Sequence, residues 1–160
     1  KILLSAKRYV YMETPYFLPT EPIFFAMRTA ALSGVDVRLM VSLKTDSKLV
    51  QMASRSYLTQ TIQAGVKVIC YEEGFNHTKL LVADDNVATI GSANIDFRSF
   101  ENNFEANAFF YDKSMAQRIK DIFLTDETKC VPLEKIKEIN HKSFIYSLWE
   151  SVVRLLSPLL

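Results

Sequence analysis

The sequence predicts an α/β fold in which a mixed β-sheet is flanked by helices on both faces. In the first 71 residues, the patterns alternate as strand–helix–strand–helix–strand, which is typical of parallel strands joined by helices. After residue 76, strand patterns follow one another with a short turn between them, which is typical of antiparallel pairing. The chain of 160 residues is 49% hydrophobic, enough to fill the core of one domain. Because no repeat or linker interrupts it, we expect a single domain over residues 1–160.

The first half of the chain supplies the parallel part of the predicted sheet. Residues 9–14 (YVYMET) are rich in β-branched and aromatic side chains, and Pro15 ends this strand. A helix over residues 21–33 has Pro22 in its first turn and Gly34 as its stop. The remaining elements of this half are a strand over residues 35–41, a helix that begins at Asp46 or Ser47 and ends at Gly65, and a strand over residues 66–71.

The second half begins with a predicted hairpin. Residues 77–83 and 87–93 form its strands, and the sequence Asp84-Asp85-Asn86 favours a tight turn between them. The later elements are a strand over residues 104–111 and a helix over residues 113–124 that is capped by Asp112.

Charge and cysteine content narrow the possible functions. Nineteen basic and eighteen acidic residues give a net charge of +1, so the sequence lacks the excess of positive charge typical of nucleic-acid partners. Cys70 and Cys130 lie far apart without metal-ligand spacing, so we expect reduced thiols and neither a metal nor another cofactor. No apolar run approaches the roughly 20 residues of a membrane-spanning helix. Since the chain begins at Lys1 without methionine, we expect a fragment of a longer protein.

The predicted hairpin carries a cluster of reactive and hydrogen-bonding residues. On a strand, His77 and Lys79 share a face, because side chains alternate with a period of two. A histidine can act as nucleophile or as general acid–base near neutral pH, and a lysine beside it neutralises anionic oxygens. Ser92 and Asn94 share a parity as well and can donate hydrogen bonds to the same oxygens. Together these residues suit phosphoryl chemistry without a metal.

Asp84 is expected to differ from the other polar residues of the hairpin. It lies seven positions after His77, an odd offset, so in a regular strand it faces away from the imidazole. We therefore expect a structural role for Asp84, holding the turn or contacting the backbone.

The spacing of these residues resembles the HKD motif of the phospholipase D superfamily. The motif reads His-x-Lys, four residues, Asp, six residues, Gly-Ser-x-Asn, and every position is present here: His77, Lys79, Asp84, Gly91, Ser92 and Asn94. Further stretches, TPYFLPTEPI from Thr14 and NIDFRSFENNFEANAFFYD from Asn94 among them, are similar to the C-terminal catalytic half of bacterial cardiolipin synthases.

The resemblance implies an activity and a set of roles. The activity is phosphatidyl transfer between two phosphatidylglycerol molecules through a phosphohistidine intermediate, giving cardiolipin and glycerol. The implied catalytic residues are His77, Lys79 and Asp84, with Ser92 and Asn94 binding the substrate phosphate. An acidic residue at Glu105 would hydrogen-bond a catalytic imidazole, although a salt bridge to Arg98 or a lysine also fits.

Such enzymes carry two HKD motifs, and this sequence contains one. The expected partner is a missing N-terminal HKD half or a second copy of the chain, with the enzyme on the cytoplasmic side of the bacterial cytoplasmic membrane and the fragment alone soluble. Two alternatives stay open: a single-HKD homodimeric phosphodiesterase or nuclease, and a module without catalytic activity.

Three other features have two interpretations each. Tyr16 and Phe17 follow a strand end, where α/β sites open, and either line a lipid entrance or cover the core. His141, in a polar stretch, is expected to be an exposed loop or cap residue. From Ser143 onward, apolar residues recur at helical spacing, which fits both packing on the domain's sheet and contact with a membrane surface.

Overall fold

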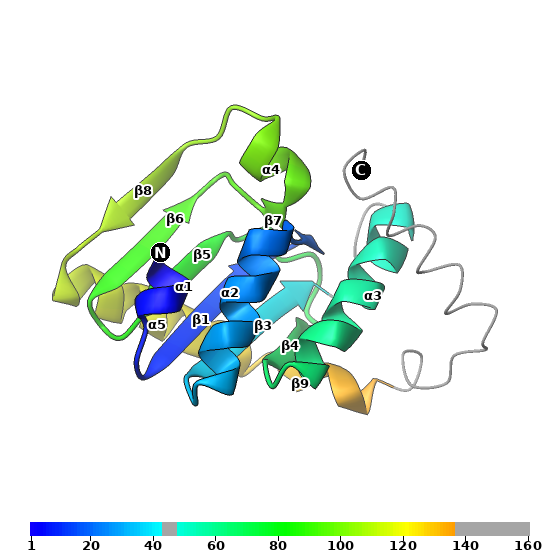
Figure 1. The fold of residues 1–160 in the computed structure, drawn as a ribbon, viewed down its shortest axis with the longest axis horizontal. Coiled ribbons are helices and arrows are strands. Elements are labelled where there is room, and N and C mark those ends of the chain that lie inside the picture. Colours follow the sequence, from blue (N-terminus) through cyan, green and yellow to red (C-terminus); the bar gives the residue numbers. More distant parts are fainter. Residues whose placement is uncertain (43–47, 137–160) are drawn as a thin grey trace.

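The computed structural model describes residues 1–42 and 48–136. Its main sheet has seven strands in the order β8-β6-β5-β1-β3-β4-β9 (Figure 1). These strands are β1 (Tyr9–Thr14), β3 (Asp36–Ser42), β4 (Lys67–Tyr71), β5 (Leu80–Ala83), β6 (Val87–Gly91), β8 (Asn107–Phe110) and β9 (Cys130–Pro132). A second, two-stranded sheet pairs β2 (Phe17–Leu18) with β7 (Ile95–Asp96).

The main sheet is mixed, as predicted. Strands β1, β3 and β4 are parallel, and β5, β6, β8 and β9 each run antiparallel to their neighbours. The parallel strands come from the alternating first half of the chain, whose helices α2 and α3 carry it back across the sheet. The helices are α1 (Ile2–Ser5), α2 (Glu21–Leu32), α3 (Lys48–Gln63), α4 (Phe97–Glu101) and α5 (Lys113–Glu127), followed by a 3-10 turn, Leu133–Lys135.

Helices cover both faces of the sheet, and the alternation of β1 shows why. Val10 and Met12 point into a core shared with α1, α2 and α3, which lie in front of the sheet in Figure 1. Tyr9 and Tyr11 point to the opposite face, where they pack with Phe123 of α5 behind the sheet. A strand that is apolar on both sides needs a helix on each face, so this burial accounts for the layered architecture.

Local signals in the sequence correctly placed several boundaries. The first strand ends at Thr14, before Pro15. The carboxylate of Asp112 caps α5 by accepting a hydrogen bond from the Met115 N–H (2.8 Å). Asp84 and Asp85 have φ angles of 54° and 58°, which makes the hairpin connection a type I′ turn.

The predicted strand over residues 77–83 was too long at its beginning, because β5 starts at Leu80. Strand β5 pairs with β1 only from Val10 to Glu13, and β1 ends at Thr14, so in this register residues 77 and 78 lie beyond the last residue of β1. Asn76 is instead hydrogen bonded to Ser42, at the end of β3.

Other differences lie at element ends and in short elements. The strand predicted over residues 87–93 ends at Gly91, and the strand predicted over residues 104–111 begins at Asn107. Both are shorter than predicted because the loop containing Ser92 turns away from the main sheet toward β2. The shortest elements, α1, β2, β7, α4 and β9, are too brief for periodicity to reveal. The caps Asp46 and Ser47, His141 and the apolar tail lie outside the described residues.

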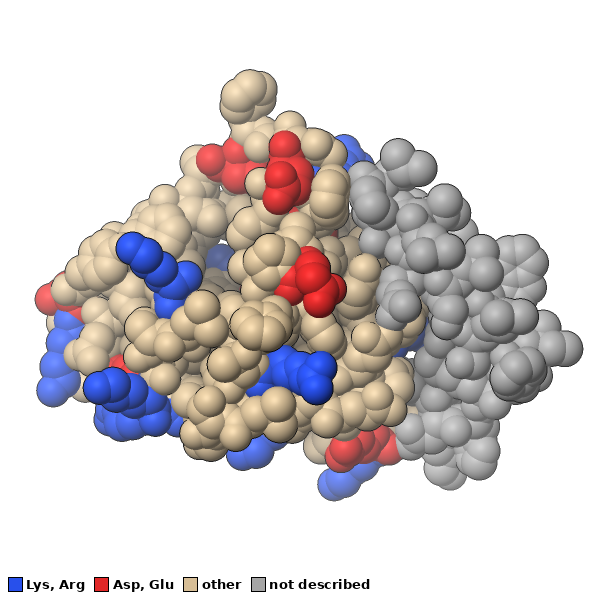
Figure 2. Space-filling model, viewed as in Figure 1, with Lys and Arg blue, Asp and Glu red and all other residues tan. Residues whose placement is uncertain are grey.

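On the face shown in Figure 2, lysine and arginine side chains lie mainly in the lower part of the view, and acidic side chains lie mainly in the upper part. The net charge of the whole chain is +1. None of the described helices is long and apolar enough to cross a membrane.

Candidate active site

The predicted reactive residues gather beside the carboxyl ends of β1 and β3. Ligand sites of α/β sheets commonly form at this edge. The segment 75–79 crosses the end of β3 and leads into β5, bringing His77 and Lys79 to the edge. The loop after β6 carries Ser92 and Asn94, and the β2–β7 pairing ties this loop to the segment that follows β1. In addition, the Ile95 N–H donates to Thr14 Oγ1 (3.1 Å).

The His77 imidazole is exposed and lies among aromatic rings. Its centroid is 5.3 Å from that of Phe75 and 6.2 Å from that of Tyr16, which it meets edge-on. Among the hydrogen bonds of the described residues, none involves an imidazole nitrogen of His77. The ring is therefore open to a substrate on at least one side, against an aromatic wall.

Lys79 is the buried cation of the site. Its side chain is almost entirely covered, with 9% exposure, and its Nζ donates to the backbone carbonyl of His77 (2.7 Å). Burial lowers the pKa of Lys79, and the negative charges of Glu105 and Asp96 act against this change. The ammonium group has three protons, and one goes to the His77 carbonyl, so it can still donate to the anionic oxygens of a substrate.

Ser92 and Glu105 form one hydrogen-bonded unit. The Ser92 hydroxyl donates to Glu105 and accepts from the Ala106 N–H (3.0 Å). The Glu105 carboxylate also accepts from Ser99 Oγ (3.1 Å) and Asn103 Nδ2 (3.3 Å). These bonds, that from Ser92 first, lower the pKa of Glu105 and keep it ionised. In the structure, Glu105 therefore accepts hydrogen bonds from hydroxyl groups and not from the His77 imidazole. The role of Glu105 in orienting a catalytic imidazole stays a prediction.

Asn94 has unused hydrogen-bonding capacity. Its backbone N–H donates to Ser99 Oγ (3.1 Å), but its side-chain Oδ1 is buried without a hydrogen-bond partner. Unpaired buried polar atoms are rare away from functional sites. This atom is an acceptor, so it does not itself bind phosphate oxygens, and the phosphate-binding role of Asn94 through its side-chain N–H groups stays a prediction.

Asp84 lies at the other end of β5, away from the reactive residues. Its carboxylate accepts hydrogen bonds from three consecutive backbone N–H groups, those of Lys7 (2.7 Å), Arg8 (2.9 Å) and Tyr9 (2.9 Å). These backbone hydrogen bonds outweigh the effect of desolvation and lower the pKa of Asp84. The expected backbone contact is therefore present: Asp84 attaches the hairpin turn to the start of β1.

Gly91 is required by the fold of this region. A Cβ atom at Gly91 would lie 1.9 Å from Asn107 Oδ1 and 2.3 Å from the Ala106 carbonyl oxygen. A larger residue would push β6 away from β8 and move Ser92, which follows directly.

Three residues that sequence reasoning missed support the segment before β5. They are Glu13, Ser42 and Asn76, and Asn76 is hydrogen bonded to both of the others. The one signal that pointed to them was the carboxylate of Glu13 in an otherwise apolar strand. Of the two aromatic residues with open interpretations, Tyr16 contacts His77, whereas Phe17 is fully buried in the core.

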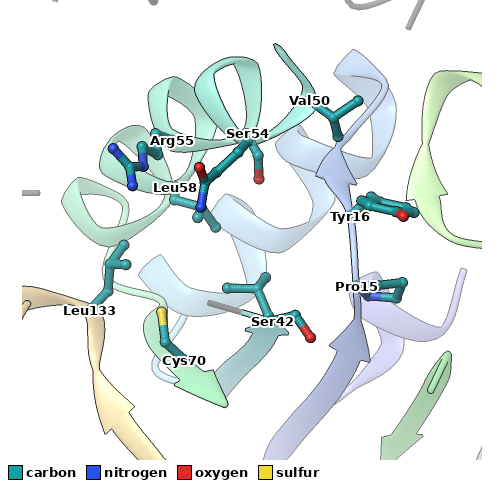
Figure 3. A pocket seen from close by; sticks show the side chains of 11 residues that line it. Pro15, Tyr16, Ser42, Val50, Ser54, Arg55, Leu58, Cys70 and Leu133 are labelled. Atoms are coloured by element: carbon teal, nitrogen blue, oxygen red, sulfur yellow. The ribbon is translucent and has the colours of Figure 1, made fainter. Parts of the chain in front are cut away.

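A small cavity lies beside the site, between α3 and the ends of β1 and β4 (Figure 3). Tyr16 and Pro15 line one side, Ser54 and Arg55 line the side formed by α3, and Cys70 lies at the base. Its volume of about 30 Å³ is close to that of one water molecule. It is too small for a glycerol group as it stands.

Residues that could hold a metal ion do not cluster. In the ranges 1–42 and 48–136, no group of three His, Cys, Asp or Glu side chains has metal-binding geometry. Burial raises the pKa of both Cys70 and Cys130 to about 12, so neither thiol is a ready nucleophile or ligand at neutral pH.

Comparison with known proteins places the chain in a family. Residues 1–127 match the family model described as cardiolipin synthase, PLD-like domain. The chain belongs to this family. As a PLD-like domain, it is similar along its whole length to curated cardiolipin synthases: 45% identical to that of Geobacillus thermodenitrificans, over 99% of this chain and 32% of the relative. It is 41% identical to that of Clostridium perfringens, over 100% of this chain and 33% of the relative.

Solved structures share the fold of this PLD-like domain. Nuc from Salmonella typhimurium, a phospholipase D family member, matches with a TM-score of 0.70 and 19% identity, over 82% of this chain and 85% of that chain. The phosphatidylserine synthase of Haemophilus influenzae matches with a TM-score of 0.76 and 16% identity, over 99% of this chain and 43% of that chain. The chain spans about a third of the length of the curated cardiolipin synthases that it matches.

Proposed function

We propose that the chain is the C-terminal catalytic half of a cardiolipin synthase that transfers a phosphatidyl group between two phosphatidylglycerol molecules. The observation that carries this proposal is the exposed His77 imidazole beside the buried Lys79 ammonium, in a chain 45% identical to a cardiolipin synthase along its length. A nucleophile or proton donor next to a fixed cation is what phosphodiester displacement requires.

The reaction proceeds in two displacements. One histidine attacks the phosphorus of the first phosphatidylglycerol, forming a P–N bond as the P–O bond to the terminal glycerol breaks, and the second histidine gives its proton to the departing glycerol oxygen. The terminal glycerol hydroxyl of the second phosphatidylglycerol then attacks the phosphorus. The second histidine takes the hydroxyl proton, and the P–N bond breaks to give cardiolipin. His77 is one of the two histidines; we assign it the acid–base role, with the nucleophilic role as the alternative.

The neighbouring groups stabilise the charge that develops on phosphorus. Lys79, already buried and paired with only a carbonyl oxygen, binds the non-bridging oxygens without first losing a shell of water. Asn94 adds a hydrogen bond from its side-chain amide. The Ser92 hydroxyl donates its one proton to Glu105. It can donate to the phosphate only after this hydrogen bond to Glu105 is broken. Glu105 can then accept a hydrogen bond from an imidazolium in the completed site.

The second histidine has to come from another PLD-like half, either in the same polypeptide or in a second copy of this chain. The exposure of two phenylalanines supports such a partner. Phe100 and Phe104, on either side of the bend after α4, are 48% and 107% exposed next to Glu105. Large exposed apolar side chains beside an incomplete site indicate a surface that another molecule covers. We place the enzyme at the cytoplasmic face of the bacterial membrane, where phosphatidylglycerol is found.

A hydrolytic phosphodiesterase is the second candidate. It is favoured by the match to Nuc, in which one PLD-like unit makes up 85% of the aligned chain. The net charge of +1 gives this alternative no support as a nuclease, because nucleic-acid-binding proteins usually carry an excess of positive charge.

The test is production of cardiolipin in a bacterial strain that lacks cardiolipin synthases. We expect the full-length protein to convert phosphatidylglycerol to cardiolipin and glycerol in membranes, and His77→Ala to remove at least 99.9% of this activity, within the roughly 10²–10⁴-fold range of general acid–base catalysis. Phosphatidic acid or cleaved DNA as the sole product would establish the hydrolytic alternative instead. Circular dichroism confirms that the variant is folded.

A further inference from the structure

Asn76, directly before His77, is hydrogen bonded through all four of its polar groups. Its backbone N–H donates to Ser42 Oγ (2.8 Å), and its backbone carbonyl accepts from the same hydroxyl (2.8 Å). Its side-chain Nδ2 donates to the carboxylate of Glu13, and its Oδ1 accepts from the Thr78 N–H (3.0 Å). The last of these bonds spans His77, so the backbone on both sides of the histidine is fixed.

The two anchors of Asn76 lie at buried positions on two central strands of the sheet. Glu13 is 2% exposed on β1, and Ser42 is 7% exposed at the end of β3. These strands are neighbouring and parallel, with Glu13 directly opposite Met40. A segment tied to two adjacent central strands moves with the sheet and not with the surface loops.

Glu13 has no other evident task. Its Oε1 accepts from Asn76, while its Oε2 is buried without a hydrogen-bond partner. An incompletely paired buried carboxyl destabilises a fold, and an apolar residue in a strand core would be less costly. Among the described residues, the bond to Asn76 is the only hydrogen bond of the Glu13 side chain, so the benefit of Glu13 must lie in holding Asn76.

We infer that Asn76, held by Glu13 and Ser42, is a positioning residue that fixes the place of His77 for in-line reaction at phosphorus. The inference rests on the proposed function. The imidazole is exposed and makes no hydrogen bond with the described residues, so its position depends on the backbone that carries it. A displacement of about 1 Å in a reacting group can lower the rate by roughly 100-fold.

The first measurement separates kcat from KM for cardiolipin formation by the full-length protein. Asn76→Ala is expected to lower kcat by 10- to 100-fold and to leave KM within about threefold, because the substrate contacts remain. Glu13→Leu, which removes the acceptor of Asn76, is expected to act in the same direction. Glu13→Gln keeps an acceptor at this place and is expected to retain most of kcat. Asn86→Ala, at the exposed hairpin turn at the other end of β5, is the matched control.

The second measurement does not depend on catalysis. This measurement uses the 160-residue chain, which has two histidines. When the chain is labelled with ¹³C-histidine, its NMR spectra contain two imidazole Cε1–H signals, and the His141→Gln variant assigns them. We expect Asn76→Ala to shift and broaden the His77 signal and Asn86→Ala to leave it in place.

The two measurements distinguish failure of the inference from failure of the proposed function. If the parent protein makes no cardiolipin, the proposed function fails and the NMR spectra alone decide the positioning role. A folded Asn76→Ala variant that keeps either the parent kcat or the parent His77 signal overturns the inference.

Discussion

At the scale of single residues, the site combines an exposed imidazole with a buried ammonium. The burial of Lys79 costs solvation free energy, which is why its pKa is lowered, but it also removes water that would screen the charge. An anionic phosphate therefore binds a cation that already lost its surrounding water when the protein folded.

We expect Lys79→Met to separate activity from stability. Loss of the cation should lower cardiolipin formation by roughly 100- to 1,000-fold, the usual effect of removing one group that stabilises a transition-state oxyanion. The free energy of unfolding should stay equal or rise, because an apolar side chain of similar length takes the place of a buried charge. Kinetic assays and urea denaturation check both parts. Lys113→Met, at the exposed start of α5, controls for general loss of a lysine. A variant with full activity would contradict the phosphate-binding role of Lys79.

The carboxyl group of Glu13 predicts a pH dependence of stability. Burial, with a smaller contribution from Asp126 of α5, raises its pKa from 4.5 to about 7, while the hydrogen bond from Asn76 acts in the opposite direction. The thiol of Cys130 on β9 also interacts electrostatically with this carboxyl. Between pH 4.5 and about 7, the folded protein holds a proton that the unfolded chain has released, so this group lowers stability as the pH rises.

Glu13→Gln should therefore stabilise the protein more at pH 8 than at pH 4. The expected gain between these conditions is at most about 3 kcal/mol, since the variant has no proton to lose. Chemical denaturation at the two pH values measures it. An identical difference at both values would show that folding does not raise the pKa of Glu13.

At the scale of elements, the hairpin β5–β6 is held at its turn by Asp84, far from the reactive residues. Two of the three backbone N–H groups bond to Oδ1 and one to Oδ2, so both carboxylate oxygens are engaged. The same hairpin continues into the segments that carry His77 and Ser92 at its other end. Asp84 belongs to the motif because it fixes the register of the hairpin to β1, not because it meets the substrate.

Asp84→Asn should therefore weaken the fold more than it weakens phosphate binding. The new amide presents N–H groups to the Lys7 N–H, and we expect a loss of roughly 1–3 kcal/mol in the free energy of unfolding, typical of a lost charged hydrogen bond. Because the folded pKa of Asp84 is lowered, its contribution is present above the unfolded pKa of 3.8 and is lost as the pH falls through the folded value.

Unfolding curves of Asp84→Asn at pH 7 and pH 2 check this prediction, since the difference from the parent should shrink at low pH. Asp112→Asn is the matched control, because asparagine caps a helix as well as aspartate does. A fully stable Asp84→Asn variant that has lost catalysis would show that this carboxylate acts in the reaction.

At the scale of the whole molecule, the chain presents exposed apolar side chains near the candidate site. Phe104 is fully exposed, and Phe109 and Tyr111, at the outer edge of the sheet, are 54% and 80% exposed. Among the described strands, β8 lies at one edge of the main sheet, with Phe109 in it and Tyr111 directly after it. Such a surface favours a partner with a complementary apolar face.

We expect the 160-residue chain to form a twofold dimer that brings two copies of His77 together. A second copy is the nearest available substitute for a homologous half, but the faces are not optimised for each other, so the dissociation constant should be on the order of 10–100 µM. Sedimentation velocity over a range of concentrations measures it. Phe104→Ser should weaken the dimer, and Phe25→Ser, on the outer face of α2, should not. A monomer at every concentration would refute the prediction.

The sequence by itself determined the fold class and the main elements, and it predicts which residues are reactive. Each of these depends on neighbours in the chain. Alternation and helical periodicity predict β1, α2 and β3, Asp112 predicts the start of α5, and the fixed spacing from His77 to Asn94 carries the motif. The predicted turn at Asp84-Asp85-Asn86 was also enough to place Asp84 at the end of β5 away from His77, whereas the parity argument does not apply because residue 77 is not in the strand.

Only the tertiary structure decided how the reactive residues are held. The bond from Asn76 to Glu13 joins residues 63 positions apart, and that from Asn76 to Ser42 spans 34 positions. Periodicity describes which face of an element a side chain takes, but it contains no information on which elements become neighbours in the sheet. Residues 77–79 were predicted as strand for that reason. Whether residues 77–79 can pair with backbone groups of β1 depends on the register of β1 against β5. That register is set when the sheet packs between its helices.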